Sequence, residues 1–153
     1  MRAGSDPGRG PLDRPFRPRL ARRVALALAT LVVVLTPVFA ISLPGPRGWG
    51  DVAGFTAIGV AIVVFCWRQA NVNLRADEGG VTVTNLVVVR RLAWAEIISV
   101  RFGGGRPWVQ LDLANGDTLA VMGIQRADGD FAAAESRRLA TLVELFSRTE
   151  CDD

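Results

Sequence analysis

Residues 80–98 read GVTVTNLVVVRRLAWAEII, a stretch rich in β-branched side chains. Apolar and polar residues alternate from Val81 to Thr84, as expected for a strand with one buried face. Residues 87–92 form a second β-branched run, which ends in Arg90, Arg91 and a leucine. The stretch therefore predicts two neighbouring strands followed by a turn.

Further short strands are predicted on both sides of this stretch. Residues 72–74 precede it and residues 98–102 follow it, with Ile98, Val100 and Phe102 expected on one face. Residues 109–113 alternate again and lead into Asn115-Gly116, a strong hairpin signal before the last strand. From residue 130 the apolar spacing changes to the 3.6-residue period of an amphipathic helix. We expect an α+β domain, a small antiparallel barrel or bent sheet of six strands capped by a C-terminal helix.

The same stretch resembles the signature of small bacterial domains of the pleckstrin-homology (PH) type. The signature consists of a strand that begins with glycine, a strand that ends in Arg-Arg, and a Trp-x-Glu-Ile motif, here Gly80, Arg90, Arg91, Trp94, Glu96 and Ile97. It is most similar to the group typified by low-molecular-weight protein antigen 6. The resemblance covers roughly residues 70–147 and implies a seven-stranded bent sheet, commonly joined to two membrane spans.

The signature residues are interpreted as structural. We expect the Trp94 indole to cover the core where the chain turns between strands. Glu96 is expected to pair with Arg91 or Arg101, because no second acid–base group is placed beside it by the sequence. Asp112 and Asp117 flank a hairpin and are interpreted as solvated turn carboxylates.

Two long apolar runs precede the domain. Residues 24–43 hold no charge over twenty positions, which matches the length needed to cross a hydrocarbon core. Residues 49–67 form a second apolar helix with a tryptophan at each end, and residues 44–48 are rich in Pro and Gly. A transmembrane hairpin with an external turn at 44–48 is predicted. The alternative is a secretory or twin-arginine signal, but the first run is longer than such signals and a second one follows.

Arginine is distributed unevenly along the chain. Residues 1–23 carry seven Arg and two Asp, whereas residues 68–153 carry ten Arg and twelve acidic residues. The N-terminal arm, residues 1–23, is also rich in Pro and Gly, so we expect it to be disordered. Positive charge before the first span and after the second places both termini in the cytoplasm. The protein is predicted to be a multi-pass protein of the plasma membrane.

The composition excludes several kinds of chemistry. The chain contains no His, Lys or Tyr, so a Ser-His-Asp triad, a Schiff-base lysine and a P-loop are impossible. Cys66 and Cys151 are too few and too far apart for a metal site, and no cofactor motif is present. Because the basic charge belongs to the arm, nucleic-acid binding is not expected. We interpret the protein as non-catalytic.

Two features are candidate contact sites. Gly103, Gly104 and Gly105 with Arg106 could hold an anion on backbone N–H groups, although a flexible hairpin loop is the simpler interpretation. Ala53, Ala57 and Ala61 form a row of small residues on the second span, as Ala25 and Ala29 do on the first. Such rows either pack the two spans together or form an interface between copies of the chain.

Two functions remain compatible with these features. The first is a membrane-tethered interaction module, in which the domain of residues 68–148 recruits an unidentified protein partner or an anionic headgroup. The second is a subunit that binds a small molecule or lipid at the mouth of the barrel. Phosphoinositide recognition is disfavoured, because the first hairpin loop carries Asp77 and Glu78 instead of basic residues. Residues 149–153 are expected to be a polar tail.

The topology can be tested by cysteine labelling of intact cells. A Gly48→Cys substitution in the external turn should react with a membrane-impermeant maleimide, because positive-inside bias puts this turn outside. Cys151 should stay protected until the membrane is opened with detergent. Reaction of Cys151 from the outside would contradict the predicted hairpin.

Overall fold

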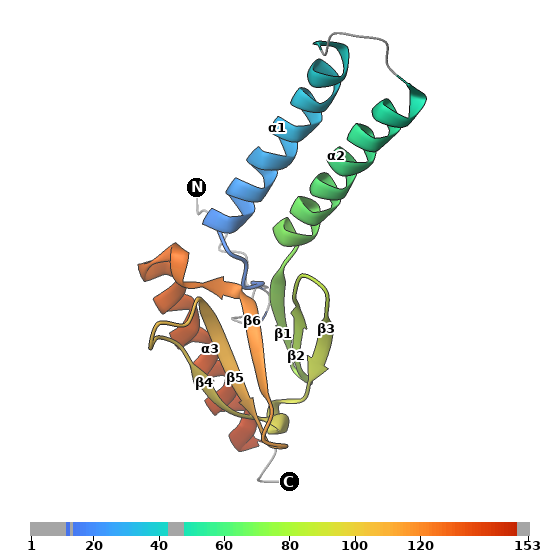
Figure 1. Ribbon diagram of the computed structural model, residues 1–153. Helices are drawn as coiled ribbons and strands as arrows, with labels where there is room; N and C mark the ends of the chain where they lie inside the picture. Colours follow the sequence, from blue (N-terminus) through green and yellow to red (C-terminus); the bar gives the residue numbers. More distant parts are fainter. Residues whose placement is uncertain (1–11, 13, 43–47, 150–153) are drawn as a thin grey trace, which may run out of the picture. The chain divides into compact units, whose positions relative to one another are not determined.

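The computed structural model describes residues 12, 14–42 and 48–149. The chain divides into two compact units. One unit runs from residue 19 to residue 71 and is helical, and the other combines the residues before 19 with those from 72 onward. Figure 1 shows the two helices of the first unit and the strands of the second.

The helical unit consists of α1 (Leu20–Ser42) and α2 (Trp49–Ala70). Both helices are long and apolar enough to cross a membrane, with mean hydropathy of 2.7 and 1.8 over their most apolar windows. Most of their apolar side chains are exposed, as those of a lipid-facing hairpin would be. At Gly59 a Cβ would lie 2.8 Å from the Thr36 Oγ1 atom, so glycine permits the close approach of the two helices.

The rows of small residues have different environments. Ala25 is buried with Cys66 and Ala70, and Ala29 packs against them, so the row on α1 does lie between the helices. The row on α2 does not, because Ala53, Ala57 and Ala61 are all exposed. Packing of this second row against α1 is therefore a wrong prediction, and its role as an interface between copies remains untested.

The helix boundaries differ from the predicted spans by a few residues. Helix α1 begins at Leu20 instead of residue 24, and α2 ends at Ala70 instead of residue 67. Arginine, glutamine and alanine favour helix, so the backbone stays helical beyond the uncharged segment. Most of the predicted external turn and of the C-terminal tail lies outside the described residues.

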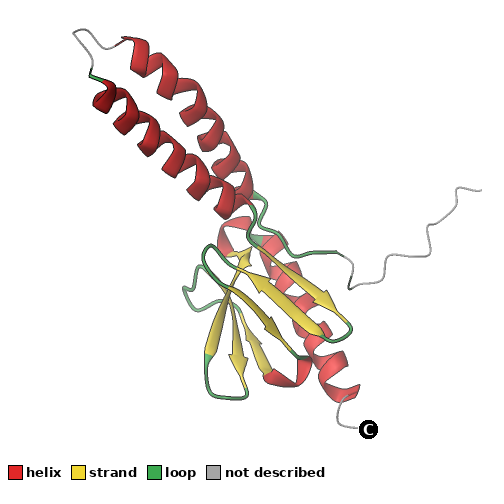
Figure 2. Ribbon diagram, turned by 90° about the vertical axis from the view of Figure 1, so that its right-hand side faces the viewer, coloured by secondary structure: helices red, strands yellow, loops and turns green. Residues whose placement is uncertain are grey.

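The second unit contains two three-stranded antiparallel sheets, in the orders β1-β2-β3 and β4-β5-β6. The strands are β1 (Asn73–Asp77), β2 (Gly80–Thr84), β3 (Val89–Leu92), β4 (Ile97–Arg101), β5 (Trp108–Leu113) and β6 (Thr118–Gln125). Two 3₁₀ turns, η1 (Trp94–Glu96) and η2 (Arg126–Asp128), precede β4 and α3. The predicted architecture of six strands and a C-terminal helix, α3 (Asp130–Thr149), is confirmed. Figure 2 shows α3 lying alongside the strands.

One hydrophobic core joins both sheets and α3. Its fully buried side chains include Leu74 of β1, Leu92 of β3, Trp94 of η1, Leu111 of β5 and Leu139 of α3. On α3 the predicted apolar face is buried or packed against this core, namely Ala132, Leu139, Leu142, Val143 and Phe146. The helix therefore closes a sheet system that is too small to bury its apolar face alone.

Part of the N-terminal arm is folded, contrary to the expectation of disorder, whereas residues 1–11 and 13 lie outside the described residues. Phe16 is 0% exposed and forms an antiparallel bridge with Leu74 of β1. The Phe16 N–H donates to the Leu74 carbonyl oxygen at 2.8 Å, and the Leu74 N–H donates to the Phe16 carbonyl oxygen at 3.0 Å. The arm thus continues the first sheet by one bridge beyond β1. The described residues contain six full strands, not the seven that the family resemblance implies.

Two other residues shape the site that Phe16 occupies. The Arg138 guanidinium of α3 lies 4.2 Å from the centroid of the Phe16 ring, and it also donates to the Arg14 carbonyl oxygen at 2.6 Å. Gly123 of β6 lies beneath the arm, since a Cβ there would be 2.9 Å from the Phe16 carbonyl oxygen. The single aromatic residue of a Pro- and Arg-rich arm is therefore part of the core.

Replacement of Phe16 tests this part of the core. Phe16→Ala should lower the free energy of unfolding by about 3–5 kcal/mol, because it leaves a cavity beneath the arm. The measurement is urea unfolding of the full chain in detergent, followed by amide hydrogen exchange in β1. Leu145→Ala, at an exposed position of α3, is the control and should change stability by less than about 0.5 kcal/mol. Equal effects of the two substitutions would show that the arm is not part of the folded core.

Candidate functional site

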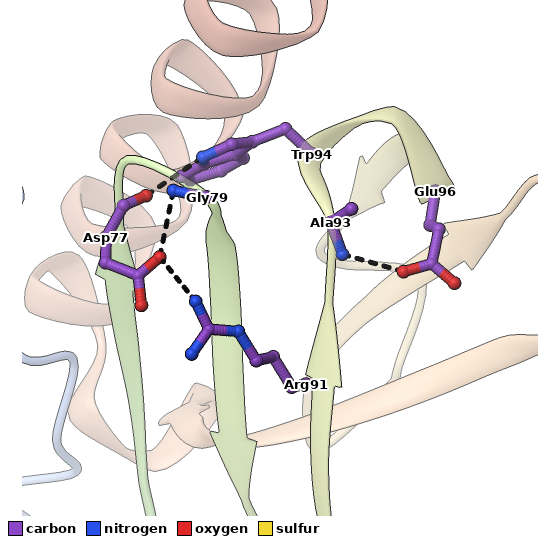
Figure 3. Close-up of polar contacts among 6 residues, drawn as sticks. All are labelled: Asp77, Gly79, Arg91, Ala93, Trp94 and Glu96. Atoms are coloured by element: carbon purple, nitrogen blue, oxygen red, sulfur yellow. Dashed lines mark hydrogen bonds and ion pairs between the residues drawn. The ribbon is translucent and has the colours of Figure 1, made fainter.

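Three of the signature residues, Arg91, Trp94 and Glu96, lie at one corner of the domain, and Figure 3 draws them with Asp77, Gly79 and Ala93. Gly80 begins β2 with a φ of +145°, a conformation that side-chain-bearing residues rarely adopt. A Cβ at this position would lie 2.0 Å from the Leu92 carbonyl oxygen on the neighbouring strand. Glycine is therefore required at the start of β2 by the close approach of β3.

Trp94 lies at the centre of this corner and is 1% exposed. Its indole Nε1–H donates to the Asp77 carbonyl oxygen at 3.0 Å, and its ring stacks on Phe146 with centroids 5.1 Å apart. The Ser147 hydroxyl donates to the Trp94 carbonyl oxygen at 3.3 Å. Trp94 thus connects the end of β1 to α3, and its predicted position in the core is confirmed.

Glu96 does not form the predicted ion pair. Its carboxylate accepts a hydrogen bond of 2.7 Å from the Ala93 N–H and thereby caps the η1 turn. Arg91 pairs instead with Asp77 at 3.1 Å. Asp77 ends β1 and Arg91 lies on β3, on the other side of β2, so the arrangement of the strands decided this pair.

Asp77 has a local structural role in the β1–β2 turn. Its Oδ1 atom accepts a hydrogen bond from the Gly79 N–H at 3.0 Å in addition to the contact with Arg91. Both partners of the ion pair are largely exposed, so the pair contributes little to stability. Together with Glu78, Asp77 keeps this turn acidic.

The remaining signature residues have no common site. Ile97 is buried in the core, whereas Arg90 is exposed on β3. The signature as a whole specifies how β2, β3 and β4 meet.

The glycine-rich loop connects β4 to β5 away from this corner. Gly103, Gly104 and Gly105 all have positive φ, and the Arg106 N–H donates to the Gly103 carbonyl oxygen at 3.3 Å. A Cβ at any of the three glycines would meet no atom within 4 Å, so conformation and not space requires glycine. The loop is a hairpin connection, and an anion-binding role for it remains a prediction.

A groove of about 310 Å³ lies between β4 and α3. It is lined by four residues of β4, Ile97, Ile98, Ser99 and Val100, and by four of α3, Ala140, Val143, Glu144 and Ser147. Strand β4 is at the end of the order β4-β5-β6, so one of its edges is not hydrogen-bonded within this sheet. An unpaired strand edge next to an apolar groove can accept an extended chain.

The exposed large apolar side chain at this groove is Ile98, which is 67% exposed. The register of β4 on β5 shifts between Ile97 and Ser99, so Ile98 is the extra residue of a β-bulge. This bulge corrects the predicted alternation, because Ile97 points into the core and Ile98 is directed outward. The alternation of apolar and polar residues in the sequence gives no signal for this bulge. The alternation therefore placed Ile98 on the buried face and did not predict the groove.

The Asp112 carboxylate of β5 accepts hydrogen bonds from Ser99 and Arg101 of β4 and from Thr118 of β6. The Ser99 hydroxyl donates to its carboxylate at 2.6 Å, and this bond is the largest cause of a lowered pKa of Asp112. Partial desolvation opposes the shift, while the Arg101 guanidinium and the Thr118 hydroxyl lower the pKa further. Asp112 is therefore a fixed anion that joins three strands, and not the solvated turn carboxylate predicted above.

Comparisons with known proteins identify the class to which this domain belongs. Residues 71–141 match the family model described as a bacterial PH domain. The uncharacterized protein Rv1417 of Mycobacterium tuberculosis (strain ATCC 25618 / H37Rv) is 30% identical over 144 residues, which cover 91% of this chain and 94% of the relative. The uncharacterized proteins MT1460 of M. tuberculosis (strain CDC 1551 / Oshkosh) and Mb1452 of Mycobacterium bovis match to the same extent.

The chain therefore belongs to the bacterial PH domain family and is homologous along nearly its whole length to these mycobacterial proteins. The narrower resemblance to the antigen 6 group, which rests on the signature within residues 80–98, stays a prediction. No solved structure gives a significant match.

Replacement of Trp94 tests the structural role of the corner. Trp94→Ala should lower the free energy of unfolding of the domain by about 3–5 kcal/mol, because the indole is fully buried. Trp94→Phe should cost less, since it keeps most of the packing and loses only the hydrogen bond to Asp77. Urea unfolding of the full chain in detergent measures both. A loss below about 1 kcal/mol for Trp94→Ala would contradict the buried position.

Proposed function

We propose that the protein is a non-catalytic interaction module, anchored in the plasma membrane by α1 and α2, that recruits a protein partner at the inner face. The observation that carries this proposal is the groove between β4 and α3, with Ile98 turned outward beside an unpaired strand edge. The groove is where we expect the partner to bind.

The anchoring part of the proposal is supported by both helices. Their apolar side chains are exposed along almost the whole length of α1 and α2, and such a surface is stable in lipid but not in water. The excess of arginine before α1 and after α2 supports a cytoplasmic location of both termini. The external position of the connecting turn follows from the same asymmetry.

The chemistry of the groove favours an extended segment of a protein as the occupant. The backbone of β4 can supply hydrogen bonds at its unpaired edge, and Ile98 and Val143 can contact alternate apolar side chains of that segment. Glu144 adds a carboxylate to the lining, which favours a basic residue in the bound segment. We expect this arrangement to bind an apolar, partly basic peptide.

The competing function is binding of a small molecule or a lipid headgroup. Small-molecule sites usually enclose most of the ligand and hold a few converging polar groups, whereas this groove is open to solvent and five of its eight lining residues are apolar. An anionic headgroup would meet Glu144 there and the acidic β1–β2 turn elsewhere. The groove therefore supports a protein partner better than either alternative.

Photocrosslinking in living cells tests the proposed partner site. A p-benzoylphenylalanine at Ile98 should give discrete protein adducts, because this side chain lies at the rim of the groove. Ala114, exposed in the β5–β6 turn, is the matched control and should give none of these adducts. Ala140→Glu within the groove should abolish the adducts at Ile98 without loss of folding.

Two other results would contradict the proposed partner site. Equal adducts from Ile98 and Ala114 would contradict a partner site at the groove. Adducts to lipid alone at Ile98 would favour the headgroup function.

A further inference from the structure

Three consecutive valines are exposed where β2 leads into β3, namely Val87 and Val88 in the turn and Val89 at the start of β3. Val87, Val88 and Val89 are 76%, 54% and 66% exposed. Single exposed apolar residues are common on proteins, but a consecutive exposed run is typical of a contact surface. No feature of the fold requires valine here, since these side chains contribute little to the core.

The turn is held firmly in this exposed position. The Asn85 N–H donates to the Val88 carbonyl oxygen at 2.8 Å and closes the turn. The Asn85 side chain donates to the Ala120 carbonyl oxygen at 2.7 Å and accepts from the Met122 N–H at 3.1 Å. Two bonds to β6 therefore fix the base of the turn, so the exposure of the valines is a defined feature of the domain.

The covalent chain keeps this turn close to the end of α2. Strand β1 begins at Asn73, three residues after the last residue of α2, Ala70, and Asn73 pairs with Thr84, the last residue of β2. The turn follows Thr84 directly. Extended residues span at most about 3.6 Å each and paired strands lie about 5 Å apart, so Val87 stays within roughly 30 Å of Ala70 at any angle between the two units.

Strand β2 has two turns of opposite character. The turn at its start, next to the end of β1, carries Asp77 and Glu78 and no exposed large apolar side chain. The turn at its end carries Val87 and Val88 and leads into the exposed Val89 and Arg90 of β3. Apolar side chains next to a basic residue are the pattern of a segment that enters an anionic lipid interface.

We propose that residues 85–89 insert their valines into the inner-leaflet headgroup region of the same membrane that holds α1 and α2. This inference rests on the proposed membrane anchoring. The turn provides a second, peripheral lipid contact, and Arg90 strengthens it where the lipid is anionic. The acidic β1–β2 turn, at the other end of β2, remains in the cytoplasm.

Site-specific fluorescence on the full chain in liposomes tests the proposal. Cys66→Ala and Cys151→Ser remove the native thiols, and single cysteines at Val88, Glu78 and Ile58 then carry the NBD fluorophore. The liposomes contain phosphatidylcholine and phosphatidylglycerol, with or without spin-labelled lipid as a quencher. Ile58 is exposed on α2 and reports membrane insertion, while Glu78 is the control on the opposite turn of β2.

The label at Val88 should be quenched by spin-labelled lipid, and aqueous iodide should quench it at least about twofold less than the label at Glu78. Val87→Asp in the Val88 background should return iodide quenching to the Glu78 level. Arg90→Gln should weaken lipid quenching in anionic liposomes and leave it unchanged in pure phosphatidylcholine.

The contrary results are distinguishable. If Ile58 is quenched by spin-labelled lipid and Val88 behaves like Glu78, the anchoring stands and the inserted turn is wrong. If Val88 is protected from both iodide and spin-labelled lipid, a protein contact covers the turn, which also overturns the proposal. If Ile58 itself escapes lipid quenching, the membrane anchoring fails.

Discussion

The hydrogen bond from the Trp94 indole to the Asp77 carbonyl oxygen, with the ring stacked on Phe146, is the contact on which the PH-type domain depends. It ties the end of β1 to the turn that leads into β4 and to the C-terminal helix. Each sheet has only three strands and cannot bury its apolar face alone. The large indole fills the space where both sheets and α3 converge, so the signature around it has a structural and not a chemical role.

The N-terminal arm shows how the domain extends beyond the segment that matches the family. Phe16 adds one antiparallel bridge to β1 and a fully buried ring to the core, although α1 and α2 separate it from the rest of the domain in sequence. The helical hairpin is thus an insertion between two parts of one folded unit. A chain shortened to begin after α2 would lack part of this core.

We propose a different contact for each of the three exposed apolar surfaces. The helices α1 and α2 would meet lipid tails, the valine turn would meet headgroups, and the groove at Ile98 would meet a protein segment. Each surface is presented by ordinary backbone geometry: a hairpin of helices, a tight turn fixed by Asn85, and a β-bulge on an edge strand. These surfaces need no reactive side chain, which suits a sequence that lacks His, Lys and Tyr.

The sequence alone determined the two apolar helices, the six strands, the amphipathic α3 and the burial of Trp94, because hydrophobic length and periodicity are local properties. Only the tertiary structure decided features that depend on contacts between distant segments. The Pro- and Arg-rich composition of the arm predicted disorder and gave no sign that Phe16 is buried, because its partner Leu74 is far along the chain. The bulge that exposes Ile98 shifts strand register, which has no local signal, and the carboxylate partners of Arg91 and Arg101 were set by pairing across the sheets.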